Sequence, residues 1–208
     1  MERTLYDYSK SSASYRVRIA LNLKGLDYEA ISVPLLENAQ RSVDYLQKNP
    51  AGLVPSFIED SEVITQSLAI LEYLEEKHPE TALLPEGAVE RARCRALALD
   101  IACDVHPLNN LRVLKYLTGH MGHSEQEKLD WYLHWLKEGL AALEAKLAHS
   151  NSRFCCGNIP TIADVCLVPQ MFNARRFELD LSPYQRLVAI DAECQSLPAF
   201  EKAHPANV

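Results

Sequence analysis

In roughly the first 80 residues, segments whose hydrophobic residues have the spacing of a strand alternate with segments that have the spacing of a helix. Runs rich in β-branched and aromatic residues predict strands at 4–8, 28–33, 54–58 and 63–65. Apolar residues at helical spacing predict helices at 14–24 and 66–78, with a short irregular helix around 43–46. A right-handed crossover makes the first two strands parallel, and the hairpin at 54–65 adds an antiparallel pair. The pattern therefore predicts a mixed sheet of four strands.

The rest of the chain reads as helical. Residues 79–88 carry two prolines and a glycine, which indicates a linker. We therefore expect a first domain at 1–80, a linker at 81–86 and an all-helical domain at 87–208. A helix is predicted at 89–106, and it resumes after a kink at Pro107 and continues to residue 117. Further helices are predicted at 124–148, 161–176, 185–194 and from 198. Thr161 and Asp164 have the spacing of a capping box.

Composition narrows the class of protein. The 208 residues are 48% hydrophobic and 24% charged, as in ordinary globular domains. The net charge of −7 argues against a nucleic-acid binder, and no apolar run is long enough to cross a bilayer. Without a signal-peptide pattern, we expect a cytoplasmic protein whose six cysteines are free and mostly buried. His120 and His123 offer too few ligands for zinc, so no metal is expected.

The candidate catalytic residues lie at the junction between the first predicted strand and the first predicted helix. Ser11, Ser12 and Ser14 lie at this junction, and Gly25 fits the position just past the end of the helix. The free amides of a helix's first turn carry partial positive charge and can hold an anion, including a thiolate. The alternative is that the serines simply cap the helix.

Six stretches in order resemble the zeta class of cytosolic glutathione transferases. They are SSASYRVRIAL (11–21), NPAGLVPSF (49–57), ITQSLAILEYLEE (64–76), HPLNNLRVLKYL (106–117), TIADVCLVPQ (161–170) and NARRFELDLSPY (173–184). The resemblance covers essentially the whole chain. It implies an α/β plus all-α architecture: an N-terminal thioredoxin-like domain that binds glutathione, followed by an all-helical domain.

The same resemblance implies an activity. Zeta enzymes are maleylacetoacetate isomerases, and bacterial maleylpyruvate isomerases look similar. In this family the glutathione thiolate adds to a cis alkene, the resulting single bond rotates, and the thiolate leaves. The resemblance thus implies glutathione as the cofactor, a small dicarboxylate as the substrate and a homodimer as the assembly. It also implies a role in the breakdown of aromatic compounds.

Family positions in the first domain carry over residue by residue. Ser11 matches the serine that activates the glutathione thiol, with Ser12 beside it, while the family cysteine at position 13 is alanine. That change puts the rate, but not the mechanism, in doubt. The glutathione contacts implied in this domain are Gln40 at the glycine end, Val54 with a cis Pro55, and Gln66 with Ser67 at the γ-glutamyl carboxylate.

The helical domain and one lysine supply the other implied contacts. His106 and Asn110 are expected on one helix face, contacting glutathione together with Arg112, although a buried histidine satisfied by an asparagine is the structural alternative. Arg176 matches the arginine that grips a substrate carboxylate, and Lys10 could serve the second one. Arg175 is expected to face solvent or an acidic neighbour. Arg16 and Arg18 are expected to pair with acids of the helical domain.

Two other functions remain open. One is a general transferase that conjugates electrophiles to glutathione and has no need of Arg176. The other is a non-catalytic binding protein that reuses the fold and has no affinity for glutathione.

Overall fold

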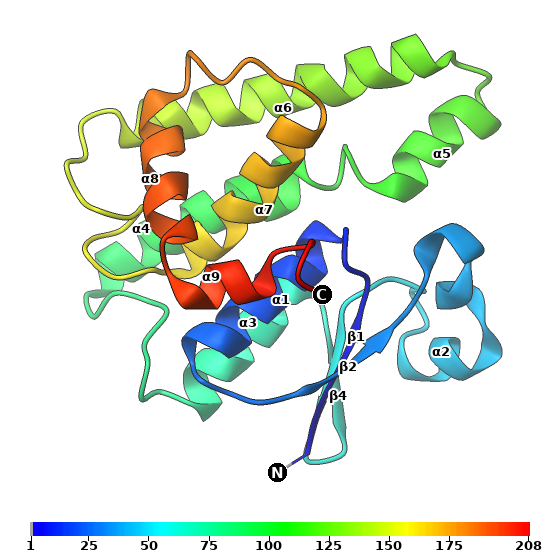
Figure 1. Ribbon diagram of the computed structural model, residues 1–208, viewed down its shortest axis with the longest axis horizontal. Helices are drawn as coiled ribbons and strands as arrows, with labels where there is room; N and C mark the ends of the chain where they lie inside the picture. The colour runs from blue at the N-terminus through cyan, green and yellow to red at the C-terminus, as the bar shows by residue number, and fades with distance from the viewer. Residues whose placement is uncertain (1) are drawn as a thin grey trace. The chain divides into compact units, whose positions relative to one another are not determined.

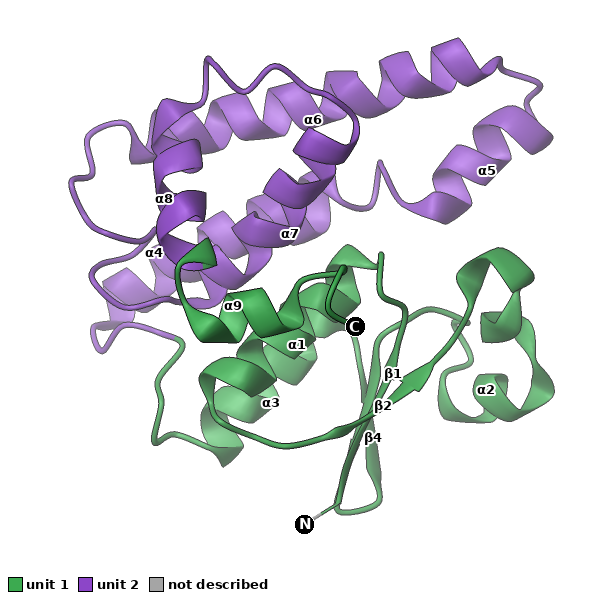
Figure 2. Ribbon diagram, viewed as in Figure 1, with its two compact units in different colours: residues 1–83, 195–208 green, residues 84–194 purple. Residues whose placement is uncertain are grey.

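The computed structural model describes residues 2–208, and these form two compact units (Figure 2). Unit 1 contains residues up to Leu83 together with Gln195–Val208, and unit 2 contains Leu84–Cys194. We had expected residues 87–208 to form one helical domain. The C-terminal segment instead belongs with the first unit.

Unit 1 is built on the predicted mixed sheet. Its strands are β1 (Arg3–Asp7), β2 (Glu29–Ser32), β3 (Ser56–Glu59) and β4 (Glu62–Thr65), in the order β2-β1-β3-β4. The β1–β2 pair is parallel, with Leu5 opposite Ala30, and the other two pairs are antiparallel. The hairpin between β3 and β4 turns through Asp60 and Ser61, which both have positive φ.

Helices cover both faces of this sheet (Figure 1). The helices α1 (Ser12–Leu23) and α3 (Ser67–Lys77) lie on one face of the sheet. Phe57 of β3 is fully buried, and its ring centre lies 6.4 Å from that of Tyr73 on α3. The short helix α2 (Val43–Lys48) lies over the opposite face and follows the turns η1 (Leu35–Glu37) and η2 (Ala39–Arg41). Gly25 has a φ of 65° just past the end of α1, as its position predicted.

The C-terminal helix α9 (Pro198–Ala203) packs on α1 (Figure 1). Asn22 Nδ2 donates to the Ala199 carbonyl at 3.0 Å, and Arg18 Nε donates to the Ala203 carbonyl at 3.0 Å. Arg18 also forms two hydrogen bonds to the Asp7 carboxylate, at 2.7 and 2.9 Å. The expectation that Arg18 pairs with an acid of the helical domain is therefore wrong, because its partner lies on β1.

Unit 2 is helical throughout. It contains α4 (Ala88–Leu99), the π-helical segment η3 (Asp100–Val105), α5 (Leu111–Gly119), α6 (Glu125–Leu147), α7 (Ile162–Arg176) and most of α8 (Gln185–Gln195). Helix α7 is buried along most of its length and is the centre of this core. The predicted capping box begins it: the Thr161 N–H and Oγ1–H both donate to Asp164 Oδ2 at 2.8 Å.

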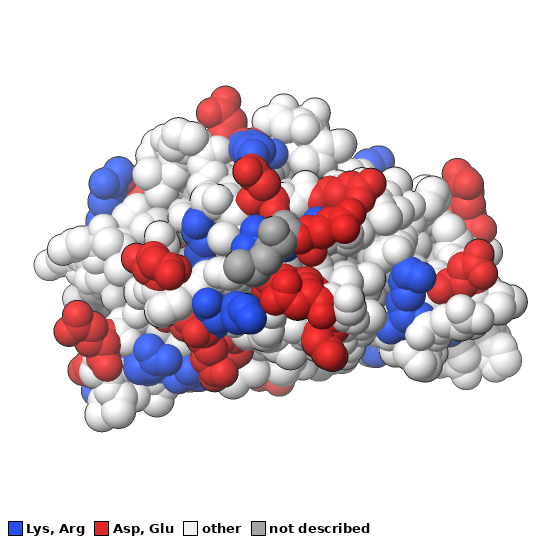
Figure 3. Space-filling view, turned by 90° about the horizontal axis from the view of Figure 1, so that it is seen from below, with Lys and Arg blue, Asp and Glu red and all other residues white. Residues whose placement is uncertain are grey.

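The cysteines follow the expected pattern. All six cysteines are free, and four of them are buried: Cys94, Cys155, Cys166 and Cys194. On the face shown in Figure 3, acidic and basic side chains are interspersed, and they do not form one extended basic patch. Across residues 2–208, none of the helices has the length and apolar character needed to cross a bilayer.

Candidate active site

The start of α1 is organised by Ser11. This residue is the N-cap, with φ −78° and ψ 118°, and its Oγ accepts a hydrogen bond from the Ser14 N–H at 3.2 Å. The prediction that a serine caps this helix is thus confirmed for Ser11. A capping hydroxyl accepts through its oxygen and keeps its own hydrogen for another acceptor. Ser11 is half-buried, and Ser12 is buried in the first turn.

The start of α3 has an unusual backbone. Gln66 precedes the helix with a φ of 70° and a ψ of 118°, and its side chain makes no capping hydrogen bond. A positive φ is uncommon outside glycine, and such strain concentrates at functional sites. Ser67 is the first helical residue and is buried. The first-turn amides of α3 are therefore not satisfied by the side chain that usually caps a helix.

A buried arginine connects these two helix starts. Arg16 lies on α1 with 2% of its surface exposed, and its Nη1 donates to Ser67 Oγ at 3.2 Å. The expectation that Arg16 pairs with the helical domain missed this contact. A charged residue within a run of buried positions was the available signal, but its partner lies 51 residues further along the chain.

The loop before β3 contains the predicted cis peptide bond. The Val54–Pro55 bond is cis, as the resemblance implied, with Pro55 buried and Val54 half-buried. Upstream, the Tyr45 hydroxyl and Asn49 Nδ2 both donate to the Leu53 carbonyl, at 2.6 and 2.7 Å. These two side chains hold the loop against α2.

Gln40 lies in η2, close to the same loop. Gly52 has a φ of 61°, and a Cβ built on it would lie 3.0 Å from the Gln40 carbonyl oxygen, so a larger residue would crowd this approach. Gln40 Oε1 is buried and has no hydrogen-bond partner within residues 2–208. A buried acceptor of this kind calls for an N–H donor. The amide groups of a tripeptide such as glutathione supply such donors, so Gln40 fits this ligand.

The end of α7 carries two adjacent arginines with different surroundings. Arg175 Nη2 lies 2.6 Å from the Asp191 Oδ2, which confirms the expected acidic neighbour. Arg176 is exposed, and its guanidinium carbon lies 5.4 Å from the centre of the Phe177 ring. The same ring stacks on Tyr132, with ring centres 3.9 Å apart. Burial raises the pKa of Tyr132, and the charge of Arg176 opposes that rise.

The segment from His106 to Arg112 differs from its prediction. His106 follows the end of η3, whereas Asn110 is the N-cap of α5 and accepts from the Arg112 N–H at 3.1 Å. They do not share a helix face, because the chain leaves the helix between them. In that interruption, buried Asn109 donates to the Tyr132 carbonyl at 3.1 Å. Arg112 is exposed, as is Lys10, which precedes the Ser11 cap in unit 1.

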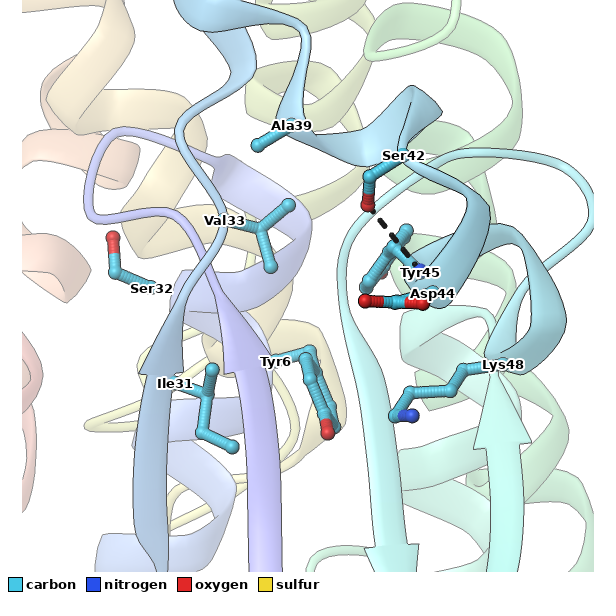
Figure 4. Close-up of a pocket in the computed structure, with 9 residues that line it drawn as sticks. All are labelled: Tyr6, Ile31, Ser32, Val33, Ala39, Ser42, Asp44, Tyr45 and Lys48. Carbon is cyan, nitrogen blue, oxygen red and sulfur yellow. Dashed lines mark hydrogen bonds between the residues drawn. The ribbon is translucent and has the colours of Figure 1, made fainter.

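A cavity of about 220 Å³ lies elsewhere on unit 1 (Figure 4). It opens between β1, β2 and α2, on the sheet face opposite α1 and α3. Tyr6 lines it together with Asp44 and Lys48, whose Nζ lies 5.6 Å from the centre of the Tyr6 ring. Since its lining includes none of the predicted site residues, it is distinct from the helix starts described above.

Known proteins resemble this chain over its full length. Residues 5–82 match the family model of the glutathione S-transferase N-terminal domain. A probable maleylacetoacetate isomerase from Vibrio cholerae is 48% identical over 209 aligned residues, which cover 100% of this chain and 97% of the relative.

Two solved structures share the fold and much of the sequence. One is a bacterial maleylpyruvate isomerase described as a zeta-class glutathione S-transferase, with TM-score 0.96, 44% identity and coverage of 99% and 98% of the two chains. The other is a maleylacetoacetate isomerase from Methylobacterium extorquens with bound malonate and glutathione, with TM-score 0.95, 38% identity and coverage of 99% and 97%. The chain therefore belongs to the zeta class of the glutathione transferase family.

Proposed function

We propose that this protein is a glutathione-dependent isomerase that converts maleylacetoacetate, or the close variant maleylpyruvate, into the trans isomer. The observation that carries the proposal is that the likeness to named isomerases extends over the whole chain. The aligned region therefore spans both the start of α1 and the end of α7.

Unit 1 is proposed to hold glutathione. When bound, glutathione supplies a thiolate that adds reversibly to the alkene. A free thiol has a pKa of about 8.5, and hydrogen-bond donors and helix N-termini lower it. Ser11 donates its remaining hydrogen to the sulfur, and the first-turn amides of α1, with Ser12 beside them, favour the negative charge.

The ends of the tripeptide are proposed to bind at separate points. Gln66 and Ser67 receive the γ-glutamyl carboxylate, because the amides at the start of α3 favour an anion. The backbone of Val54, before Pro55, pairs with the cysteinyl part, and Gln40 contacts the glycine end. Three residues of unit 2 are further candidates for glutathione contacts: His106, Asn110 and Arg112.

Arg176 is proposed to bind one substrate carboxylate. Its planar guanidinium suits two parallel hydrogen bonds to a carboxylate, and it has no acidic partner within residues 2–208 that would compete. Lys10 offers a compact charge for the second carboxylate. In a protein with net charge −7, each of these cations would attract a carboxylate to its own position. The malonate bound to a relative is also a dicarboxylate.

The assembly and location belong to the same proposal. We expect a homodimer in the cytoplasm. The homodimer is expected from the family membership alone, because composition does not show an oligomeric state.

The test is a glutathione-dependent absorbance assay on both diacids, run beside conjugation of a neutral aryl chloride. Arg176→Ala is expected to lower kcat/KM for the diacid by about 100-fold, as for the loss of a charge-assisted hydrogen bond, and to leave conjugation unchanged. Arg175→Lys, which keeps a cation beside Asp191, is the matched control. Conjugation without any diacid turnover in the wild type would favour a general transferase instead.

A further inference from the structure

Arg16 is buried on α1 at a place where a charge is costly. Residues 14–21 of this helix are all buried, and a buried charge is tolerated only when it is hydrogen-bonded or paired. Arg18, two residues further on, shows a structural solution, because Asp7 and backbone carbonyls hold its guanidinium. Among the contacts of Arg16 is one that reaches the start of α3, where its Nη1 donates to the hydroxyl of Ser67.

This contact fixes the direction in which Ser67 can donate. A guanidinium has donors and no acceptor, so Ser67 Oγ must accept from Arg16. The hydroxyl hydrogen of Ser67 is then left for a different acceptor. An anion at the start of α3 is the acceptor that the free amides of this helix also favour.

Two positive groups also lie near this point. The N-terminus of α3 carries a partial positive charge. The Arg16 guanidinium is hydrogen-bonded to Ser67, the first residue of this helix. The backbone of Gln66 has a positive φ, and the Gln66 side chain does not cap the first-turn amides of α3. A carboxylate would interact favourably with both positive groups and would accept from Ser67.

We propose that Arg16 is a positioning residue for the γ-glutamyl α-carboxylate of glutathione, which orients the Ser67 hydroxyl and supplies positive charge behind it. This inference rests on the proposed function, because it takes glutathione as the ligand of unit 1. It adds a residue that does not touch the ligand and acts through Ser67.

The experiment measures binding and requires no turnover. Calorimetric titration compares glutathione with γ-aminobutyryl-cysteinylglycine, the same tripeptide without the α-carboxylate. The wild type is expected to prefer glutathione by about tenfold or more, the range of a charge-assisted hydrogen bond. Arg16→Gln is expected to lose most of this preference, and Arg16→Lys to retain part of it.

Arg18→Lys is the matched control, since it alters a buried arginine on the same helix. It is expected to lower the melting temperature and to leave the preference unchanged. If Arg16→Gln does not fold, the pair Arg16→Met with Ser67→Ala removes both partners together and is expected to bind the two tripeptides equally well.

The outcomes separate this inference from the proposed function. A wild type that binds neither tripeptide overturns both. A wild type that prefers glutathione, combined with an Arg16→Gln or double variant that keeps the full preference, overturns the role of Arg16 and leaves the isomerase proposal standing. Equal loss of affinity for both tripeptides also overturns it, because a merely structural arginine would act in that way.

Discussion

Ser11 illustrates how one side chain can serve the fold and a ligand together. Its oxygen accepts from the Ser14 N–H, which stabilises the start of α1. Its hydrogen is not used by that bond and can be donated to an anion at the same helix end. The two interpretations of the serine-rich junction are therefore compatible, and a substitution must be interpreted for stability and for chemistry separately.

Ser11→Ala is expected to raise the pKa of the bound glutathione thiol and to slow isomerisation at neutral pH, because the sulfur loses a donor. The measurement is the pH dependence of kcat, whose rising limb is expected to move to higher pH. Loss of the cap also costs about 1 kcal/mol of stability.

Ser124→Ala separates these two effects. Ser124 is the N-cap of α6, and its Oγ accepts from the Glu127 N–H at 3.2 Å. Its loss is expected to lower the melting temperature without moving the pH profile. An identical pH profile in Ser11→Ala and the wild type would remove Ser11 from the chemistry.

At the scale of elements, Glu59 joins two strands and a helix. It lies at the end of β3 and is fully buried; Arg3 on β1 donates to it at 2.6 Å, and His78, after α3, lies 3.1 Å away. Burial alone would raise the pKa of Glu59, but hydrogen bonds from Tyr73, His78 and Arg3 outweigh it and hold the pKa below its usual value. Burial and the same carboxylate raise the pKa of Tyr73 to about 12.

Glu59→Gln is expected to lower the free energy of unfolding at pH 7 by about 1–3 kcal/mol. Because the folded-state pKa is lowered, the contribution of Glu59 is complete above the unfolded pKa of about 4.3 and is lost as the pH falls through the folded value. The difference in unfolding free energy between wild type and variant, from urea titrations, is therefore expected to shrink only below about pH 4.3.

The control for this change is Glu62→Gln. Glu62 faces Glu59 across the β3–β4 hairpin but is exposed, so its neutralisation is expected to have little effect at any pH. A difference between wild type and Glu59→Gln that persists undiminished at pH 3 would contradict the explanation.

At the scale of the whole molecule, the two ends of the chain meet in one unit. Helix α9 completes the core beside α1, with Phe200 and Ala203 both fully buried. The sheet of unit 1 is thus stabilised by residues that lie far from it in the sequence. Unit 1 consequently depends on the chain's final segment, and deletions there are expected to affect the glutathione-binding unit.

Phe200→Ala is expected to cost about 3–5 kcal/mol, because it removes a fully buried ring from α9, the helix that packs on α1. Hydrogen exchange would follow the effect locally: amides of α1 are expected to exchange faster, and those of α6 in unit 2 to change less. The exposed neighbour Glu201 provides the control Glu201→Ala. A cost below 1 kcal/mol would show that α9 is not an essential part of unit 1.

Local signals explain why much of the fold was predictable. The four strands and most helices follow from periodicity, and the caps at Ser11 and Thr161 follow from residue type and spacing. These features depend on residues a few positions apart, so a single sequence displays them. The prediction failed at His106 and Asn110, where the helical pattern continues but Pro107 and buried Asn109 take the chain out of the helix.

The linear order of residues was enough to predict most helices and strands, the mixed sheet and the resemblance that implies glutathione chemistry. The pairing of distant groups became visible in the folded protein: Arg16 with Ser67, Arg18 with Asp7, and α9 with α1. The physical reason is that a buried arginine must find a hydrogen-bonding partner, but its sequence neighbours do not specify which one. That choice is made when the helices pack on the sheet.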